Sequence, residues 1–384
     1  MTMTLRFDAV SEANPGPKWE ARWQRSWPAY RSWFLARGGH RGPDRKECRE
    51  AMERYMPELL PVYDRLTLLA GNSDLAARFL STWCPPTYLG GCSLAAAADG
   101  DHVRLVRNYD LSPDLNEGLL LRTAWTGRAV MGMVEFLWGL SDGINDAGLS
   151  VALAYGGRSE TGRGFGITTI LRYVLETCDT VPEALQVFRR VPSHMAYNIV
   201  VADRDGRTAS VELSPGGGVS VMPHAIATNH QSGPTVSERP AFMRSFERYS
   251  HLETMERKPL ALRDAFMREP LKQDRYSEGF GTLFTAEYDC VERCMELTWP
   301  DDGWVKSLDG FTEGTKVVSY ESAPEQSAEY AQGDMDWSKA AFVDWFAVAR
   351  DFMNGQGRPI ESYLAGNAVT SPPDFSKIST ERQC

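Results

Sequence analysis

The stretch Leu89-Gly90-Gly91-Cys92-Ser93 stands between a helix-favouring N-terminal segment and a series of short β-type runs. Glycine reaches backbone conformations that other residues avoid, and two glycines leave the peptide bond before Cys92 sterically open. A thiol in that position can attack the carbonyl carbon of its own preceding residue. A Gly-Gly-Cys sequence is also common in ordinary turns, so the motifs around it must decide between the two interpretations.

Three polar motifs follow Cys92 at the ends of predicted strands. They are Arg107-Asn108-Tyr109-Asp110, Gly143-Ile144-Asn145-Asp146-Ala147-Gly148-Leu149 and Thr228-Asn229-His230. Each has an ordinary structural interpretation as well. Arg107 and Asp110 can form an exposed ion pair, and Asn229 and His230 can be turn residues that bond their own backbone.

The order and spacing of these motifs resemble the penicillin acyltransferase and choloylglycine hydrolase group of N-terminal nucleophile (Ntn) hydrolases. The closer match is to the acyl-coenzyme A:6-aminopenicillanic acid acyltransferase branch, and it covers about residues 85–300. In that branch an internal Gly-Cys bond is cut autocatalytically, which implies cleavage between Gly91 and Cys92. The resemblance also implies an α+β fold, a four-layer αββα sandwich, and the sequence pattern outside the matched region adds a helical prosegment and a C-terminal helical extension.

The resemblance assigns roles to five residues. Cys92 would be the nucleophile through its thiol and the general base through its freed α-amine, which has a reference pKa of about 7.7–8.0. Asp110 would hold the new N-terminus, and Arg107 fills the polar position three residues before it. Asn229 would donate to the oxyanion through its side-chain amide, and Tyr155 through its backbone N–H.

One departure concerns the leaving group. In the acyltransferase branch a Ser-Arg pair precedes a Gly-x-Thr-Leu-Phe strand, but here the corresponding pair is Ser277-Glu278. The bile-salt hydrolase branch has an arginine on a different element, for which Arg244 and Arg248 are candidates. The resemblance therefore leaves the substrate open.

The implied function is that of an autoprocessed acyltransferase or amidohydrolase acting through a Cys92 thioester on a small acylated metabolite. No metal or organic cofactor is required, although an acyl-coenzyme A or acyl-carrier thioester can serve as co-substrate. A first alternative is a Cys–His amidase in which His230 activates an uncleaved Cys92. A second is an inactive binding or scaffolding protein of the same fold.

The hydrophobic pattern agrees with an α+β class. MAYNIVVADRDGRTASVELSP (195–215) and GTLFTAEYDCVERCMELTWP (281–300) predict hairpins with helix pairs between them, which argues against a parallel doubly wound sheet. We divide the chain into a helical prosegment (1–91), a catalytic core (92–320) and a C-terminal helix and tail (321–384). The C-terminal helix is predicted from one apolar face, formed by Phe342, Trp345, Phe346, Ala349, Phe352 and Met353.

Within the prosegment, residues 17–90 favour helix. Trp19, Trp23 and Trp27 recur every four residues and predict one packed helix face, which Pro28 would stop or kink. Because these tryptophans need a buried surface, we expect the prosegment to stay attached after cleavage.

Composition excludes several classes of protein. The 384 residues carry a formal net charge of −10, which argues against nucleic acid or an anionic membrane as the main partner. We expect a cytoplasmic protein because the N-terminus lacks the pattern of a signal peptide.

The seven cysteines are scattered, so a disulfide framework is not expected, and the close pair Cys290 and Cys294 lacks the further ligands of a zinc site. The oligomeric state is left open.

Overall fold

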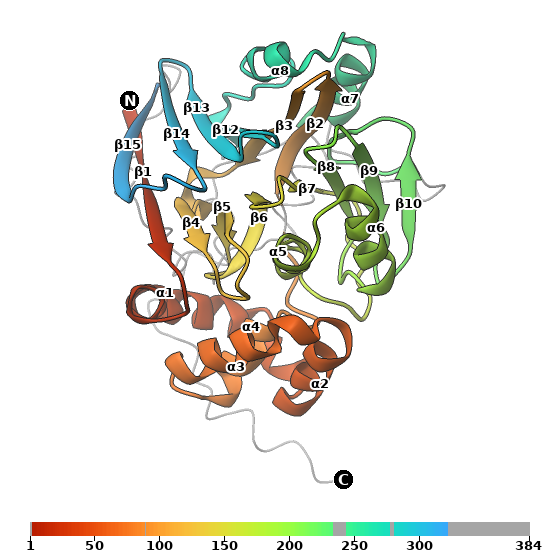
Figure 1. Cartoon of the computed structure of the whole chain (residues 1–384). Helices are drawn as coiled ribbons and strands as arrows, with labels where there is room; N and C mark the ends of the chain where they lie inside the picture. The colour runs from red at the N-terminus through yellow and green to blue at the C-terminus, as the bar shows by residue number, and fades with distance from the viewer. Residues whose placement is uncertain (1, 89, 233–242, 277–279, 322–384) are drawn as a thin grey trace, which may run out of the picture.

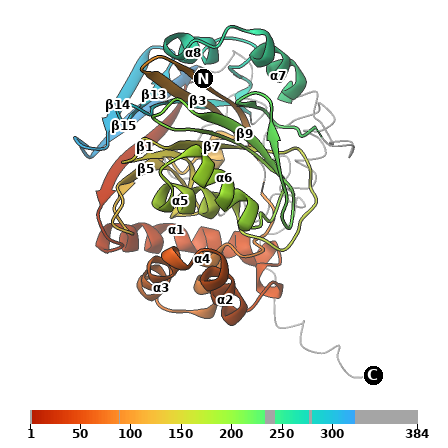
Figure 2. The same ribbon diagram turned by 45° about the vertical axis from the view of Figure 1, so that its right-hand side comes forward.

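A computed structural model describes residues 2–88, 90–232, 243–276 and 280–321. Within these ranges the strands form two sheets, one of nine strands and one of six. The two sheets pack face to face between layers of helices (Figure 1). Figure 2 shows the layers in sequence, from α7 and α8 through the sheets to α5 and α6, with α1–α4 beyond them.

The bounds of the elements are as follows. The strands are β1 (Thr2–Glu12), β2 (Gly91–Asp99), β3 (His102–Leu111), β4 (Leu119–Thr123), β5 (Val130–Glu135), β6 (Gly139–Asn145), β7 (Ser150–Tyr155), β8 (Tyr197–Ala202), β9 (Thr208–Leu213), β10 (Val219–Met222), β11 (Ile226–Ala227), β12 (Gly281–Asp289), β13 (Cys294–Trp299), β14 (Asp302–Ser307) and β15 (Gly314–Glu321). The helices are α1 (Pro17–Ala36), α2 (Arg45–Tyr55), α3 (Leu60–Leu69), α4 (Asp74–Ser81), α5 (Ile167–Thr177), α6 (Val181–Arg190), α7 (Ser245–Thr254) and α8 (Pro259–Phe266).

The sheet topology brings distant segments of the chain together. The nine-stranded sheet has the order β10-β9-β8-β7-β6-β5-β4-β1-β15, and the six-stranded sheet has the order β11-β2-β3-β12-β13-β14. Neighbouring strands are antiparallel, as predicted, except for the parallel pair β1–β4. Both predicted hairpins, β8–β9 and β12–β13, are confirmed.

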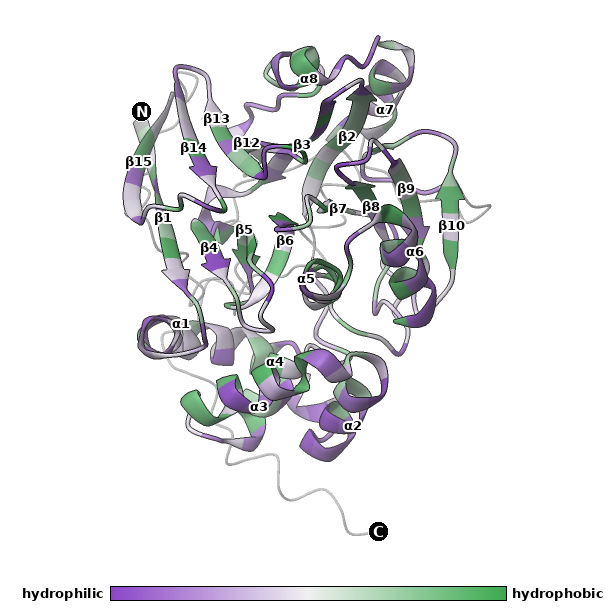
Figure 3. Cartoon of the chain, in the orientation of Figure 1, coloured by the Kyte–Doolittle hydropathy of each residue, from purple (hydrophilic) through white to green (hydrophobic). Residues whose placement is uncertain are grey.

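Alternating burial along the strands explains the layers. On β2, Leu94 and Ala96 face the core between the two sheets, whereas Ala95 and Ala97 pack with residues of α7 and α8. On β7, Ala152 faces the inter-sheet core and its neighbours pack towards α5 and α6. Each sheet therefore buries both of its faces, which confirms the αββα sandwich. Figure 3 shows apolar residues along β2, β6 and α5, and a hydrophilic surface on α2.

The prosegment differs from its prediction in one respect. Its helices lie within the predicted region, but its first residues form β1, which pairs with β4 and β15 inside the nine-stranded sheet. The prediction of an entirely helical prosegment is therefore wrong. The signal was present in the sequence, because Met3, Leu5, Phe7 and Ala9 alternate with more exposed residues and are all buried.

Other contacts tie the prosegment to the rest of the chain. Trp19 Nε1 donates to the carbonyl of Leu137 (3.1 Å), and Trp138 Nε1 donates to the carbonyl of Leu80 (3.0 Å). The prosegment therefore forms part of one core with the residues that follow it.

The tryptophan stripe is confirmed on α1. Trp23 stacks on Trp19 and on Trp27, with ring centroids 5.5 and 4.4 Å apart. Pro28 does not stop the helix, which continues to Ala36. The predicted C-terminal helix and the Ser277-Glu278 departure lie outside the described residues.

Candidate active site

Cys92 lies at the beginning of β2, an interior strand of the six-stranded sheet. Gly91 precedes it opposite Asp110 of β3. A Cβ atom on Gly91 would come within 2.6 Å of the Phe280 ring and 2.9 Å of the Asp110 carbonyl oxygen. Gly91 does not have a left-handed φ, and glycine is required here because the neighbours pack too closely for a side chain.

The thiol of Cys92 is buried beside a guanidinium group. Arg107 Nη2 donates to Cys92 Sγ (3.2 Å), and Arg107 Nη1 forms an ion pair with Asp142 Oδ1 (2.7 Å). Burial raises the pKa of the Cys92 thiol to about 11, although the charge of Arg107 acts in the opposite direction. In the uncut chain the group is therefore a protonated thiol at neutral pH and needs a base to become a nucleophile.

This pKa predicts how Cys92 reacts with iodoacetamide. A pKa of about 11 leaves about one thiolate in ten thousand at pH 7, so the alkylation rate should rise about tenfold per pH unit between pH 7 and 10. Peptide mass spectrometry on the uncut species measures this rate at Cys92, with free cysteine as the reference. Arg107→Met should lower the rate at every pH in that range. A rate that reaches its plateau near pH 7 would contradict the assignment of a protonated thiol.

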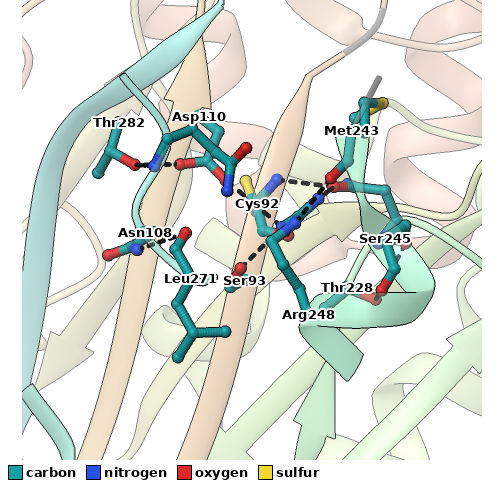
Figure 4. Close-up of polar contacts among 12 residues, drawn as sticks. Cys92, Ser93, Asn108, Asp110, Thr228, Met243, Ser245, Arg248, Leu271 and Thr282 are labelled. Carbon is teal, nitrogen blue, oxygen red and sulfur yellow. Dashed lines mark hydrogen bonds and ion pairs between the residues drawn. The ribbon is translucent and has the colours of Figure 1, made fainter. Parts of the chain in front are cut away.

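Asp110 is fully buried at the end of β3. Its Oδ1 accepts from Thr282 Oγ1 (2.7 Å), and its Oδ2 lies 3.4 Å from Arg248 Nη1 (Figure 4). Burial raises the pKa of this carboxyl group, whereas Arg248 and Thr282 lower it. Asp110 thus pairs with Gly91 at the start of β2, and its role in holding a new N-terminus stays a prediction.

Asn229 contacts both sides of the Gly91–Cys92 bond. Its Oδ1 accepts from the backbone N–H of Cys92 (3.0 Å) and from Arg248 Nη2 (2.9 Å). Its Nδ2 donates to the carbonyls of Tyr155 (3.1 Å) and Gly90 (3.4 Å). Because two donors surround one end of the Asn229 side-chain amide and two acceptors surround the other end, the positions of its Oδ1 and Nδ2 atoms are determined.

Arg248 of α7 connects these groups. It is fully buried, and its Nη1 donates to the Cys92 carbonyl and to Ser93 Oγ, each at 2.7 Å. Figure 4 shows its guanidinium between Cys92, Ser93 and Asp110. Of the two candidate arginines, Arg244 instead pairs with Glu247 of its own helix. The structure therefore brings Arg248, and not Arg244, to the site.

Tyr155 ends β7 close to Asn229, and the contact that the structure gives it there is through its carbonyl. The role of its N–H as an oxyanion donor stays a prediction. Asn145 of the second motif lies elsewhere: its amide bonds the carbonyls of Leu175 and Cys178 and organises the β6–β7 turn.

The ordinary interpretations of the motifs are not supported. Arg107 and Asp110 are both fully buried and pair with Asp142 and Arg248 instead of with each other. His230 Nδ1 lies 2.8 Å from Ser245 Oγ, and its ring packs against Phe246 and Tyr249. In the described part of the chain no hydrogen bond joins it to Cys92, so the geometry does not favour the Cys–His alternative.

A cavity of about 60 Å³, here named the Cys92 pocket, opens beside the thiol. The prosegment contributes Trp33 and Tyr88 to its lining, and the core contributes Tyr109, Glu117 and Glu135. Each buried water needs at least about 10–15 Å³ by this measure, so the pocket of the uncut chain holds only a few waters.

Within the described ranges, no group of three or more His, Cys, Asp or Glu side chains is placed to hold a metal ion. Over the same residues, no helix combines the length and apolarity needed to cross a membrane.

The fold is thus an αββα sandwich in which Cys92 lies at the start of an interior strand and buried polar side chains contact its N–H, thiol and carbonyl. The model of the acyl-coenzyme A:6-aminopenicillanic acid acyl-transferase family matches residues 97–304. Because the match spans more than half of the 384 residues, the chain belongs to this family, as the motifs predict. Cys92 precedes the matched range.

Several solved structures are similar to this chain at low identity. A mutant of the conjugated bile acid hydrolase from Clostridium perfringens is 12% identical over 62% of this chain and 99% of that chain, with a TM-score of 0.39. Penicillin V acylase from Agrobacterium tumefaciens is 15% identical over 64% and 96%, with a TM-score of 0.37. The N-acylethanolamine-hydrolyzing acid amidase orthologue from Caenorhabditis elegans is 16% identical over 59% and 99%, with a TM-score of 0.40. No curated protein sequence gives a significant match.

Proposed function

We propose that this chain cuts its own Gly91–Cys92 bond and then transfers acyl groups through a thioester on Cys92. The observation that carries the proposal is the arrangement around Cys92. Asn229 binds its N–H, Arg107 its thiol and Arg248 its carbonyl, and all three contacting side chains are fully buried. A cysteine that served only for packing would need partners for its N–H and carbonyl, but it would not need a buried guanidinium group on its thiol.

The cleavage step is an N-to-S acyl shift followed by hydrolysis. Cys92 Sγ attacks the Gly91 carbonyl carbon, the C–N bond breaks, and the thiol proton goes to the released amine. Water then hydrolyses the thioester, which leaves a Gly91 carboxylate, a free thiol and a new α-amine on Cys92.

The same groups serve turnover. The α-amine accepts the thiol proton, and Asp110 holds that amine in place. Asn229 Nδ2 and the N–H of Tyr155 stabilise the oxyanion as the substrate carbonyl is attacked. The leaving group departs with a proton, and water or an amine resolves the thioester. Each of these groups belongs to the chain itself, and an acyl-coenzyme A or acyl-carrier thioester would be a co-substrate.

The substrate is proposed to be a small acylated metabolite with an amide or thioester bond. The support is the small Cys92 pocket, which has no room for a folded polypeptide. A site that excludes water and binds an amine favours transfer, whereas an open site favours hydrolysis.

A panel of acyl thioesters and N-acyl amides, each with and without added amines, tests the proposal. We expect at least one to be consumed by wild type and none by Cys92→Ala prepared in the same way. New amide from a thioester plus an amine identifies a transferase, and free acid alone identifies a hydrolase. A correctly cut protein that turns over neither class would contradict the proposal and favour the scaffolding alternative.

A further inference from the structure

Two acidic side chains line the Cys92 pocket, although neither has a role in the proposed chemistry. Glu135 ends β5, and Glu117 precedes β4. Glu117 accepts from the Tyr30 hydroxyl and from the backbone N–H groups of Phe136 and Leu137. These contacts fix its carboxylate at the pocket wall, opposite the prosegment helix α1 that carries Tyr30.

Glu135 lies at the electrostatic centre of the pocket. Burial is the main cause that raises the pKa values of Tyr88, Tyr109 and Tyr197, and the charge of Glu135 adds to it in each case. Burial is also the main cause that raises the pKa of Glu117, to about 7, and the charge of Glu135 adds to it there and, as the smallest cause, at the Cys92 thiol. One carboxylate thus acts on groups all around the pocket, which places it close to whatever binds there.

The cations next to the pocket do not balance these two carboxylates. Arg107 is the arginine in the lining, and its Nη1 already pairs with the buried Asp142. The charge of Arg22 lowers the pKa of Glu117, but Arg22 Nη2 also forms an ion pair with Asp8 Oδ2 (3.8 Å). Burial raises the pKa of both acidic side chains, so a ligand that carries a positive charge would stabilise their ionised forms and would be bound by them in turn.

The remaining lining suits an ammonium group. Aromatic rings of Trp33, Tyr88, Tyr155 and Tyr197 surround the cavity, and such faces attract cations. The Tyr88 hydroxyl is buried beside the Tyr197 side chain. Its oxygen can accept from the N–H donors of a bound ammonium group.

We propose that the Cys92 pocket selects substrates whose acyl part carries a protonated amine, bound by Glu135 and Glu117 within the aromatic wall. The inference rests on the proposed function. The acyl side is chosen because Thr87, Tyr88 and Gly90 line the pocket, and they belong to the segment on the acyl side of the scissile Gly91–Cys92 bond. In the uncut chain the pocket measures about 60 Å³, a size that suits a short chain with a terminal amine and not a long alkyl chain.

The test compares substrates of matched shape on the processed protein. A 4-aminobutyryl anilide and a pentanoyl anilide differ only in an ammonium group that replaces a methyl group. Pairs with shorter and longer acyl chains are included to find the chain length that fits the pocket. We expect wild type to prefer the aminoacyl member of the best pair by about 10- to 100-fold in kcat/KM. Glu135→Gln should lower this preference about tenfold or more, and Glu117→Gln should lower it as well.

Glu50→Gln is the matched control, since Glu50 is an exposed residue of α2, and it should leave the preference unchanged. A wild type that prefers the pentanoyl member at every chain length would overturn the inference. So would a preference that both Glu135→Gln and Glu117→Gln leave intact. If Glu135→Gln does not fold, the substrate preference of Glu117→Gln is the measurement that decides.

A binding readout separates this inference from the proposed function. Protection of Cys92 from iodoacetamide by 4-aminobutyramide is compared with protection by pentanamide, and neither measurement requires turnover. Stronger protection by the amine in wild type, reduced in Glu135→Gln, supports the cation pocket even if no anilide is consumed. Equal or weaker protection by the amine contradicts it.

Discussion

Cys92→Ala should fold, remain a single uncut chain and turn over no acyl substrate. The variant removes both the thiol and the only route to a free α-amine at this position, so the nucleophile and the base are lost together. We expect a fall of at least about 10⁴-fold, to the background of the assay, because removal of a nucleophile leaves only binding and oxyanion stabilisation. Arg107 keeps its bonds to Ser141 and Asp142, so the loss of stability should be about 1–3 kcal/mol.

Cys294→Ala is the matched control for this variant. Cys294 is a half-buried cysteine on β13, remote in sequence from every polar motif, and its replacement should leave cleavage and turnover intact. Thermal denaturation of both variants verifies that they fold. A Cys92→Ala protein with residual turnover above a tenth of wild type would show that another group is the nucleophile.

Asn229→Ala should lower turnover by about 10²–10³-fold, the usual loss for one oxyanion donor. We propose that the same donor also stabilises the oxyanion that forms at the Gly91 carbonyl during cleavage, so cleavage should slow as well. In the uncut chain Nδ2 is directed at the carbonyls of Gly90 and Tyr155, and the release of the segment before Cys92 would free it for the substrate.

Asn229→Asp separates donation from positioning. Asp keeps an oxygen for the Cys92 N–H and for Arg248 Nη2, but it removes the N–H donor on the other side. If donation is the essential role, Asp and Ala should lose similar amounts of kcat. Recovery of wild-type kcat in Asn229→Asp would show that Asn229 only positions Cys92 and would refute its assignment as a donor.

Local sequence patterns predicted much of the fold. The Asp205-Gly206 turn between two apolar runs predicted β8–β9, and the spacing of Trp19, Trp23 and Trp27 predicted one face of α1. The strand β1 was missed although its alternation is clear, because the helical signal that follows it dominated the interpretation of the whole prosegment. Its place between β4 and β15 depends on pairings more than 100 residues away, which no local pattern contains.

The site was predicted in part. Cys92, Asp110, Asn229 and Arg107 were found through motif order, and the structure brings all four together. Motif order says nothing about burial, so it could not distinguish an exposed ion pair of Arg107 and Asp110 from two separate buried pairs.

The groups that complete the site gave weaker signals. Asp142 lies within a strand and Thr282 at the start of another, and neither stands out without knowledge of what lies opposite. Arg248 could not be distinguished from Arg244, because only the direction of each side chain from its helix separates a surface pair from a buried one. Glu117 and Glu135 lie outside every motif and were recognised only through the cavity that they line.

The most direct test of the central claim is the intact mass of wild type and of Cys92→Ala, under native and denaturing conditions. Wild type should separate into fragments 1–91 and 92–384 in denaturant. Natively the two should stay together at the mass of the whole chain plus one water, since β1 is part of the nine-stranded sheet. Cys92→Ala should give one uncut chain in both conditions. A wild-type chain that stays uncut while it turns over substrate would contradict the account.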